Sequence, residues 1–330
     1  MSLTSADAGD APKLESSRRN LVIVRASDSS LHPTWLDGAG DRSWDLLVSY
    51  FGDDPDKFRD ERVIRVDGKG PKWQALHRLL TDRAELLRRY DYVWLPDDDI
   101  ACAAQEIERM FSVMRRYDLL LGQPSLSSRS YFSWCITLQN PTTRMRWTNF
   151  VETMAPCFHR DLLVRCLPML APYISGWGLD WAWPKEAGLQ TRRVAIIDDV
   201  RVTHTRPVGG PNHRFLEARG VTAYDEMAHV LRTHGIEDRT TRIFEILTRG
   251  GLRLSAQSPV ARFLLRAGYA IVVAAAYVRR DPGRRNLLRR LRVHLANPAA
   301  LADYPNTILP DGTNLVTGIA AAAGGPERAT

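Results

Sequence analysis

The sequence lacks the features of a disulfide-rich or secreted small domain. Only four of its 330 residues are cysteine, at positions 102, 135, 157 and 166, and no two of them have the CxxC spacing of a zinc or redox motif. Reduced thiols and a cytoplasmic location are therefore expected. Residues 1–19 also lack the apolar core of a signal peptide, and their Ser, Ala and Asp content predicts a disordered lead-in.

Most of the chain has no net positive charge. Residues 251–330 hold 11 Arg, no Lys and four acids, a surplus of seven that equals the whole net charge of +7. The first 250 residues are therefore neutral overall. We expect a domain over residues 20–250 and a basic, partly helical appendage over 251–330, with the boundary near Gly250 and Gly251.

The appendage also lacks an uncharged run long enough to span a bilayer. Its longest run, 267–278, is short, and Arg262 and Arg266 interrupt its upstream extension. Seven arginines follow within 279–292, so residues 256–295 suit a helix lying on an anionic membrane surface. A core-packing helix followed by a solvated basic one fits equally well. Nucleic acid is not expected as a partner, because aromatic residues are not interleaved with the arginines.

Short apolar runs alternate with helical patterns in the first part of the chain. Strands are expected over 21–24, 46–49, 63–66, 92–95 and 118–121, and helices over 72–89 and 104–116. This alternation predicts an α/β fold with a mainly parallel sheet flanked by helices. Residues 132–158 look extended, a helix is expected over 159–167, and two strand-like stretches, 194–197 and 200–204, flank Asp198 and Asp199.

Three consecutive acids, Asp97, Asp98 and Asp99, follow the expected strand 92–95. Carboxylates at the carboxyl end of a strand repel one another unless a cation lies between them, and hard oxygen ligands suit Mg²⁺ or Mn²⁺. The triplet therefore indicates a metal site that handles phosphates. A solvated acidic turn that caps the next helix is the competing interpretation.

Three features together resemble the GT-A type of nucleotide-sugar-dependent glycosyltransferase. Asp97 and Asp99 match its DxD motif, residues 176–180 (Gly-Trp-Gly-Leu-Asp) match its glycine-aromatic-glycine-acid loop, and His204 matches its late metal-binding histidine. The resemblance implies a Rossmann-like GT-A fold, a Mn²⁺ or Mg²⁺ ion and a nucleoside-diphosphate sugar as donor.

The phrases at 72–73, 151–156 and 176–180 are also similar to a domain-of-unknown-function family that in plants carries the label "lysine-ketoglutarate reductase trans-splicing related". The similarity covers about residues 20–215. Nothing in these residues supports the activity that the label names. The resemblance implies the fold more firmly than the reaction.

Metal ligands follow from the resemblance and from the alternation of an extended chain. We expect Asp99 to bind the metal directly and Asp97 to lie nearer the donor's ribose or a metal-bound water. Asp98 is expected to point away, because neighbouring residues of an extended segment face opposite sides. His204 is expected to add a nitrogen ligand; alone, it reads as an ordinary surface or core histidine.

Asp180 and Glu152 are the candidate catalytic residues. Asp180 follows a loop in which Gly178 permits close backbone approach and Trp177 offers a flat apolar wall, both of which are expected to contact the donor. An acid there suits a general base that deprotonates the acceptor hydroxyl, and it also suits a helix N-cap. Glu152 lies in an apolar segment, so it contacts substrate or pairs with an arginine.

The remaining candidates are donor contacts. The resemblance places Arg25, Ser27 and Asp28, at the end of the first strand, against the nucleotide base and ribose. Lys72 is expected at a helix N-terminus, where a cation is favourable only beside an anion, and this indicates a phosphate contact. A solvated lysine is the alternative.

The sequence thus predicts a metal-dependent glycosyltransferase that moves a sugar to a glycan, lipid-linked or other hydroxyl acceptor. A Mg²⁺-dependent nucleotidyltransferase or phosphohydrolase would use the same acids. A GT-A-like domain that binds nucleotide or glycan without turnover is a third interpretation. The sugar, the acceptor and the stereochemical outcome are open at this point.

Overall fold

A computed structural model describes residues 17–208, 215–279, 285, 287–289, 291–292 and 297–301. The expected lead-in lies mostly outside these residues, as do Arg280, Arg284 and Arg290 of the arginine cluster. Within the described part, Arg18 and Arg19 form ion pairs with Asp45 and Asp91, at 2.9 and 2.8 Å. The four cysteines are free thiols.

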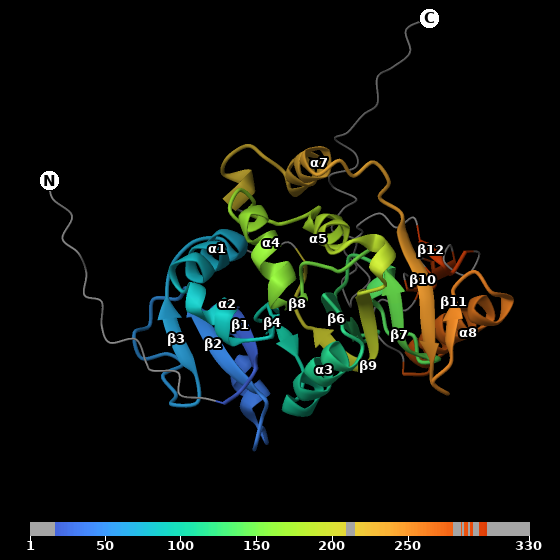
Figure 1. Cartoon of the computed structure of the whole chain (residues 1–330), viewed down its shortest axis with the longest axis horizontal. Coiled ribbons are helices and arrows are strands. Elements are labelled where there is room, and N and C mark those ends of the chain that lie inside the picture. Colours follow the sequence, from blue (N-terminus) through green and yellow to red (C-terminus); the bar gives the residue numbers. More distant parts are fainter. Residues whose placement is uncertain are drawn as a thin grey trace, which may run out of the picture.

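The chain forms one large sheet with helices on both faces (Figure 1). The strands are β1 (Asn20–Ala26), β2 (Trp44–Tyr50), β3 (Ile64–Asp67), β4 (Tyr92–Trp94), β5 (Ile100–Ala101), β6 (Leu121–Leu126), β7 (Thr143–Thr148), β8 (Cys157–His159), β9 (Val194–His204), β10 (Thr241–Thr248), β11 (Arg253–Ser255) and β12 (Ala300–Leu301). The α-helices are α1 (Lys72–Asp82), α2 (Ala84–Arg89), α3 (Ala104–Arg116), α4 (Arg160–Leu170), α5 (Leu179–Ala187), α7 (Ala223–Thr233) and α8 (Pro259–Val278). Short 3₁₀ helices cover His32–Leu36, Cys135–Thr137 and Leu189–Thr191.

The sheet is mixed, so the prediction of a mainly parallel sheet was wrong. Its order is β11-β10-β7-β9-β6-β8-β4-β1-β2-β3, with β12 on β10 and β5 on β9. The pairs among β1 to β4 and the pair β6–β9 are parallel, as βα alternation requires. β8 enters antiparallel between β4 and β6, and β7, β10 and β11 extend the sheet antiparallel. These strands come from the 132–158 region and the later chain, where the helix-strand alternation is lost.

Most of the expected elements are present, with shifted ends. The helix expected over 72–89 breaks at Arg83, where the backbone leaves the helical region (φ −121°, ψ 54°). The strand expected over 118–121 begins only at Leu121. The two stretches around Asp198 form one strand, β9, in which the register against β6 slips between Ile197 and Arg201.

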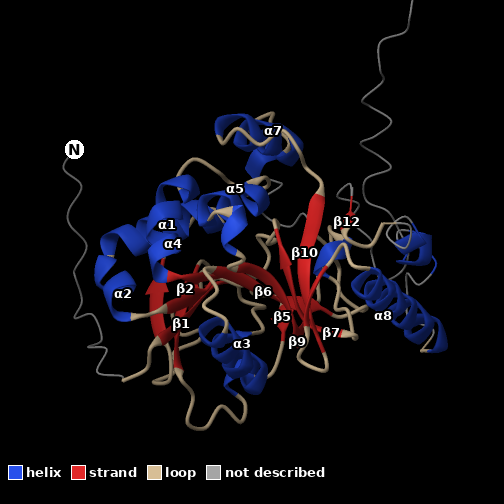
Figure 2. Cartoon of the chain, turned by 45° about the vertical axis from the view of Figure 1, so that its right-hand side comes forward, coloured by secondary structure: helices blue, strands red, loops and turns tan. Residues whose placement is uncertain are grey.

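Alternating side chains divide the core into two layers. In β1, Leu21 and Ile23 pack with the helices α1, α4 and α5, whereas Val22 and Val24 pack on the opposite face with α3. Figure 2 shows α3 below the sheet and the other three helices above it. Strands buried on both faces read as continuous apolar runs, which is why the sequence identified them.

A buried ion pair fixes the centre of the antiparallel half. The Arg146 guanidinium on β7 donates from Nε and Nη2 to both carboxylate oxygens of Asp198 on β9, each at 2.8 Å, and both side chains are fully buried. Its remaining contacts are the carbonyls of Ile136 and Leu138 and the Tyr269 hydroxyl of α8. This single arginine therefore connects β7, β9, the 135–138 turn and α8.

The residues after the expected boundary at Gly250 and Gly251 continue the sheet. β11 pairs antiparallel with β10, and Asn140 donates a hydrogen bond of 2.9 Å to the Leu265 carbonyl of α8. α8 begins before the apolar run expected at 267–278 and includes Arg262 and Arg266. With 20 residues it is long and apolar enough to cross a membrane by length and composition, which corrects the statement that this segment is too short. A separate domain over 251–330 stays a prediction.

Removing one partner of the buried pair should destabilise the fold. We expect Asp198→Asn to lower the free energy of unfolding by about 3–5 kcal/mol, because Arg146 would keep a buried, uncompensated charge. The neighbouring Asp199 pairs with the partly exposed Arg144 and Arg249, so Asp199→Asn should cost less than about 1 kcal/mol. Urea unfolding followed by circular dichroism compares the two variants. Equal losses would show that burial of this pair is unimportant.

Candidate active site

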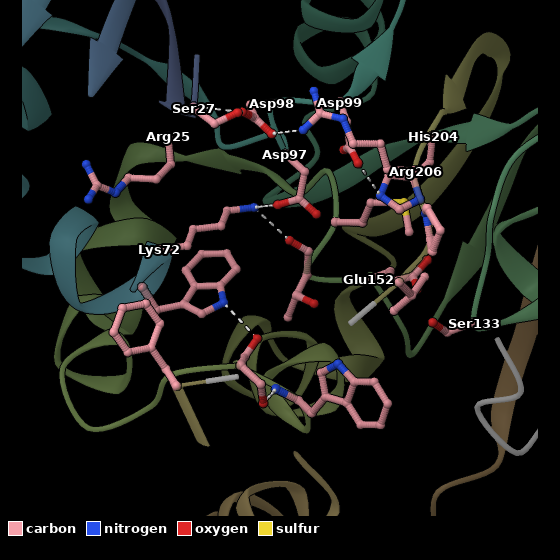
Figure 3. A pocket seen from close by; sticks show the side chains of 18 of the residues that line it. Arg25, Ser27, Lys72, Asp97, Asp98, Asp99, Ser133, Glu152, His204 and Arg206 are labelled. Atoms are coloured by element: carbon pink, nitrogen blue, oxygen red, sulfur yellow. Dashed lines mark hydrogen bonds and ion pairs between the residues drawn. The ribbon is translucent and has the colours of Figure 1, made fainter. Parts of the chain in front are cut away.

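A cavity of about 420 Å³ opens where β1, β4 and β9 end (Figure 3). Its walls come from the carboxyl ends of these strands, the start of α1, the 152–154 and 175–177 loops, and Met227 of α7. Most of the residues predicted as functional line this one cavity: Arg25, Ser27, Lys72, Asp97, Asp99, Glu152, Trp177, Asp180 and His204.

Backbone hydrogen bonds hold the acid triplet rigidly where the chain leaves β4. The Asp97 N–H donates to the Met154 carbonyl at 2.8 Å, and the Asp98 carbonyl accepts from Leu31 N–H at 2.7 Å. The Asp99 carbonyl accepts from the Thr205 N–H and hydroxyl, at 3.1 and 2.8 Å. The triplet is therefore a fixed turn and not a loose solvated one.

The three carboxylates point to different partners. Asp97 accepts a hydrogen bond from Lys72 Nζ at 2.6 Å. Asp98 turns to β1, where its Oδ2 accepts from the N–H and hydroxyl of Ser27, at 2.8 and 2.5 Å. Asp99 faces His204, with 3.2 Å between Oδ2 and Nε2. Asp98 has partners different from those of the other two, as expected, but the reason given was wrong: the segment is a turn and not extended, and the contacts with Ser27 orient Asp98.

Pairing of β5 with β9 brings the histidine to the acids. Ile100 lies opposite His204 in this antiparallel pair, so Asp99, one residue earlier, lies next to the imidazole. His204 Nδ1 lies 2.9 Å from the Tyr131 carbonyl, which can only accept, so Nδ1 donates and Nε2 faces Asp99. Burial lowers the pKa of His204, but the hydrogen bond and charge of Asp99 outweigh it and the pKa is raised.

Asp97, Asp99 and His204 together fit a divalent cation. One ligand atom from each lies within 4.8 Å of the others. Asp99 Oδ1 is buried and has no hydrogen-bond partner among the described residues, which is costly unless something else binds it. The Tyr131 carbonyl fixes the imidazole tautomer that leaves Nε2 available as a ligand. The two carboxylates suit Mn²⁺ and Mg²⁺, whereas an imidazole nitrogen favours a transition metal over the hard Mg²⁺ ion.

Cationic side chains lie beside this group. Lys72 is the first residue of α1, as expected, but its Nζ binds Asp97 and the Thr153 carbonyl, the latter at 3.1 Å. Arg25 is buried against the Phe51 ring, and burial lowers its pKa to about 10. Arg206, which the sequence reasoning did not select, donates to Asp98 Oδ1 at 3.3 Å. Lys69 also lines the cavity, so four cationic side chains are in its wall, and two of them, Lys72 and Arg206, contact the acidic turn directly.

Two further carboxyl groups line the cavity without a cationic partner in hydrogen-bond contact. Asp180 Oδ1 accepts from Thr153 N–H at 2.7 Å and Oδ2 from Gly178 N–H at 3.2 Å. Burial raises its pKa to about 7. Burial, and then the nearby charge of Asp180, raises the pKa of Glu152 to about 8. Glu152 Oε2 has no hydrogen-bond partner among the described residues. Pairing of Glu152 with a core arginine, one of the two expectations, is not seen there.

Asp180 does not act as the N-cap of α5. Gly178 is the N-cap residue, with a φ of +98° that favours glycine. A side chain at this position would also clash, because its Cβ would lie 2.8 Å from Val230 Cβ. Asp180 is the second residue of the helix, and its carboxylate binds the backbone on both sides of the turn. Its orientation is therefore fixed by two amide groups.

Glu226 of α7 holds the glycine-tryptophan loop and was missed in the sequence. Its Oε1 accepts from Ser175 N–H, the Ser175 hydroxyl and Gly176 N–H at 2.8, 2.5 and 2.8 Å, and Oε2 accepts from Ile174 N–H at 2.7 Å. A capping box of Thr222 and Asp225 starts α7, and Glu226 follows it directly; no local sequence pattern marks Glu226 as the acceptor for this loop.

Two expected donor contacts do not line the cavity. Asp28 accepts a hydrogen bond from the Tyr50 hydroxyl instead, and Gly178 packs against α7. Ser27 lies at the wall, with its hydroxyl bound to Asp98. Phe51, Ser133, Trp134 and Phe215 line the cavity and were not predicted, since single aromatic or hydroxyl residues carry no spacing signal.

Comparison with known proteins gives weak similarity in structure. No family model and no curated protein sequence matches the chain. Residues 1–349 of S. aureus TarS superpose with a TM-score of 0.46 and 10% identity over 67% of this chain and 65% of that chain, and the UDP-GlcNAc complex gives the same values over 67% and 66%. The UDP complex gives a TM-score of 0.39 and 8% identity over 56% and 59%. This chain thus spans just under two thirds of the TarS segment. Similarity this weak assigns no activity, and the family resemblances stay predictions.

The raised pKa of Glu152 makes stability depend on pH. A raised folded-state pKa gives stability that is present at low pH and lost as the pH rises through that pKa. Glu152→Gln should therefore gain melting temperature relative to wild type between about pH 4, the unfolded pKa, and about pH 8, and the gain should then level off. Thermal unfolding in the presence of a chelator measures it. The exposed Glu237→Gln is the control, and a flat difference for Glu152→Gln would contradict the assigned burial cost.

Proposed function

We propose that this protein is a metal-dependent glycosyltransferase that transfers a sugar from a nucleoside-diphosphate sugar to a hydroxyl acceptor. The observation that carries the proposal is the cluster of Asp97, Asp99 and His204, with the orphaned Asp99 Oδ1, in the same cavity as Lys72 and Asp180. Transfer of a sugar from a nucleoside diphosphate needs positive charge to stabilise the diphosphate leaving group and a base to deprotonate the acceptor. A cation site, a lysine and an acid with a raised pKa in one cavity could supply both.

Asp97, Asp99 and His204 would hold Mn²⁺ or Mg²⁺. When bound, the cation stabilises the negative charge that grows on the diphosphate as the bond to the sugar breaks. The backbone contacts of the triplet keep Asp97 and Asp99 in place, so little reorganisation accompanies charge development. This rigidity is what electrostatic stabilisation requires.

Lys72 and Arg25 supply the remaining positive charge on the donor side. Lys72 Nζ is 2.6 Å from Asp97, so it lies at the edge of the cation site and can contact an oxygen of the diphosphate. Arg25, near the end of β1, lies over the ring of Phe51, which follows β2, and this partly apolar wall suits a base and ribose. The backbone of Ser27 is bound to Asp98, so this wall and the acidic turn move together.

Asp180 is the proposed general base. Its carboxylate takes the proton of the acceptor hydroxyl while that oxygen bonds to the anomeric carbon and the bond from this carbon to the diphosphate oxygen breaks. A pKa of about 7 lets Asp180 be deprotonated at neutral pH and still accept a proton in the transition state. Glu152, whose pKa is raised to about 8 in the absence of a cation, can hold a proton there and donate a hydrogen bond to substrate.

Metal-dependent donor binding can be tested without knowing the sugar. UDP, GDP, ADP and CDP, each with and without Mn²⁺, are screened by thermal shift. A ligand at about 100 times its Kd adds ~2.7 kcal/mol to the folded state. One nucleotide should stabilise the protein with Mn²⁺ by more than the two separate effects combined.

Asp99→Asn should abolish this joint effect while leaving the melting temperature without ligand near that of wild type. Asp98→Asn is the matched control, because Asp98 is in the same turn but outside the ligand cluster, and it should keep the Mn²⁺ effect. If Asp99→Asn responds like wild type, the metal site is wrong.

Asp180→Asn tests the chemical step. Once a donor is identified, we expect kcat to fall by about 10²–10⁴ with the thermal shift from donor and Mn²⁺ unchanged, since only the transition state uses the base. Release of free sugar from the donor reports on turnover without the acceptor. Loss of donor binding would make Asp180 a structural or donor-contact residue. Phosphate release with no sugar transfer would favour a phosphohydrolase.

A further inference from the structure

The outer face of α8 is apolar although it faces solvent in the described structure. The exposed large side chains on it are Val260, Phe263, Ile271, Tyr277 and Val278, which are 39% to 83% exposed. The small residues Ala270 and Ala274 lie between them and are also exposed. The spacing of three, four and seven residues places all of these on one side of the helix. We call this set the α8 stripe.

The opposite side of α8 is fixed to the domain. Ala261, Leu265, Gly268, Tyr269 and Ala276 are buried. A Cβ at Gly268 would lie 1.9 Å from Asn140 Oδ1, so the helix backbone packs directly on the 139–142 turn. The Tyr269 hydroxyl accepts a hydrogen bond from Arg146 at 3.2 Å. A helix held along one side in this way lies flat against the domain and does not cross a bilayer by itself.

Exposed apolar side chains are concentrated on the α8 stripe relative to the rest of the described surface. Five of the nine exposed large hydrophobic residues found in the described chain lie on this one helix. An apolar helix on a protein surface indicates a binding face, because monomeric soluble proteins rarely expose large contiguous apolar patches.

Among the described residues, the charged side chains that line the hollow next to α8 are all arginines. A hollow of about 430 Å³ next to the helix is lined by Ile271, Val272, Ala275 and three arginines, Arg129, Arg201 and Arg279, with no acid in its lining. Arg279 donates to the Ser128 hydroxyl at 2.8 Å, which fixes it over the rim. Residues 251–279 contain four arginines and no acidic residue. Apolar side chains beside a hollow lined by arginines match an anionic bilayer, with acyl chains beneath a layer of phosphates.

We infer that the α8 stripe binds an anionic membrane surface, with its apolar side chains in the interfacial layer and Arg129, Arg201 and Arg279 on lipid phosphates. The inference is independent of the proposed reaction. The helix lies parallel to the membrane, so the domain stays in one aqueous compartment. This locates the membrane contact on a described face of the domain and not only in the arginine cluster after residue 279.

Vesicle flotation of the full chain tests the inference. Wild type should float with phosphatidylcholine vesicles that contain phosphatidylglycerol, should float weakly with phosphatidylcholine alone, and should be released by high salt. The double variant Phe263→Gln, Ile271→Gln should bind anionic vesicles at least about tenfold more weakly, with an unchanged melting temperature because both side chains are already exposed. Its control is Val164→Gln, Val221→Gln, which changes exposed apolar residues elsewhere and should bind like wild type.

The arginines have their own test. Arg129→Gln, Arg201→Gln should lose most of the salt-sensitive part of binding, whereas Arg88→Gln, Arg219→Gln should not. Wild type that fails to float would overturn the inference, as would a stripe variant that binds like wild type. A wild-type dimer that becomes a monomer in the stripe variant, measured by light scattering, would assign the face to self-association instead.

Discussion

Five carboxyl groups line one cavity, and repulsion among four of them, Asp97, Asp99, Glu152 and Asp180, is the constraint on which the site depends. Asp97 and Asp99 have Lys72 and His204 as partners, whereas Asp180 and Glu152 have no cation in hydrogen-bond contact and keep protons at unusually high pH. A protein that assembles such a group loses stability unless a ligand brings charge of the opposite sign. Under the proposed function, a cation held by Asp97 and Asp99 would relieve part of this repulsion, and the lysine and arginine side chains of the same cavity would attract an anionic donor.

Because these carboxyl groups repel one another, the segments that carry them must be held in place by hydrogen bonds. The acid turn is bound by backbone hydrogen bonds to the 154 and 205 regions, and Asp180 is bound by two amide groups. The four hydrogen bonds accepted by Glu226 link α7 to the loop that carries Trp177. Farther away, the Arg146–Asp198 pair holds β7, β9 and α8 together, which supports the end of β9 that carries His204.

Elements whose burial pattern is simple were predictable. β1, β2 and β4 are buried on both faces and read as apolar runs, and α3 has a single apolar side, so its bounds were found as Ala104–Arg116. The antiparallel half was not predictable in the same way. β7 contains the buried Arg146 and β9 contains the buried Asp198, and each residue looks like a surface residue until its partner is known.

The sequence by itself determined which chemical groups the site contains and how a few of them are arranged locally along the chain. Three acids after an apolar run, a glycine-tryptophan-glycine loop and a basic, lysine-free tail are local facts, and the different orientation of Asp98 was expected although it arises in a turn and not in an extended segment. Tertiary structure decided which distant residues meet. Antiparallel pairing of β5 with β9 brought His204 to Asp99, the packing of α7 selected Glu226, and attachment of α8 to β7 turned an apolar segment outward on one side. Such contacts depend on the register between elements far apart in the chain, which no local pattern encodes.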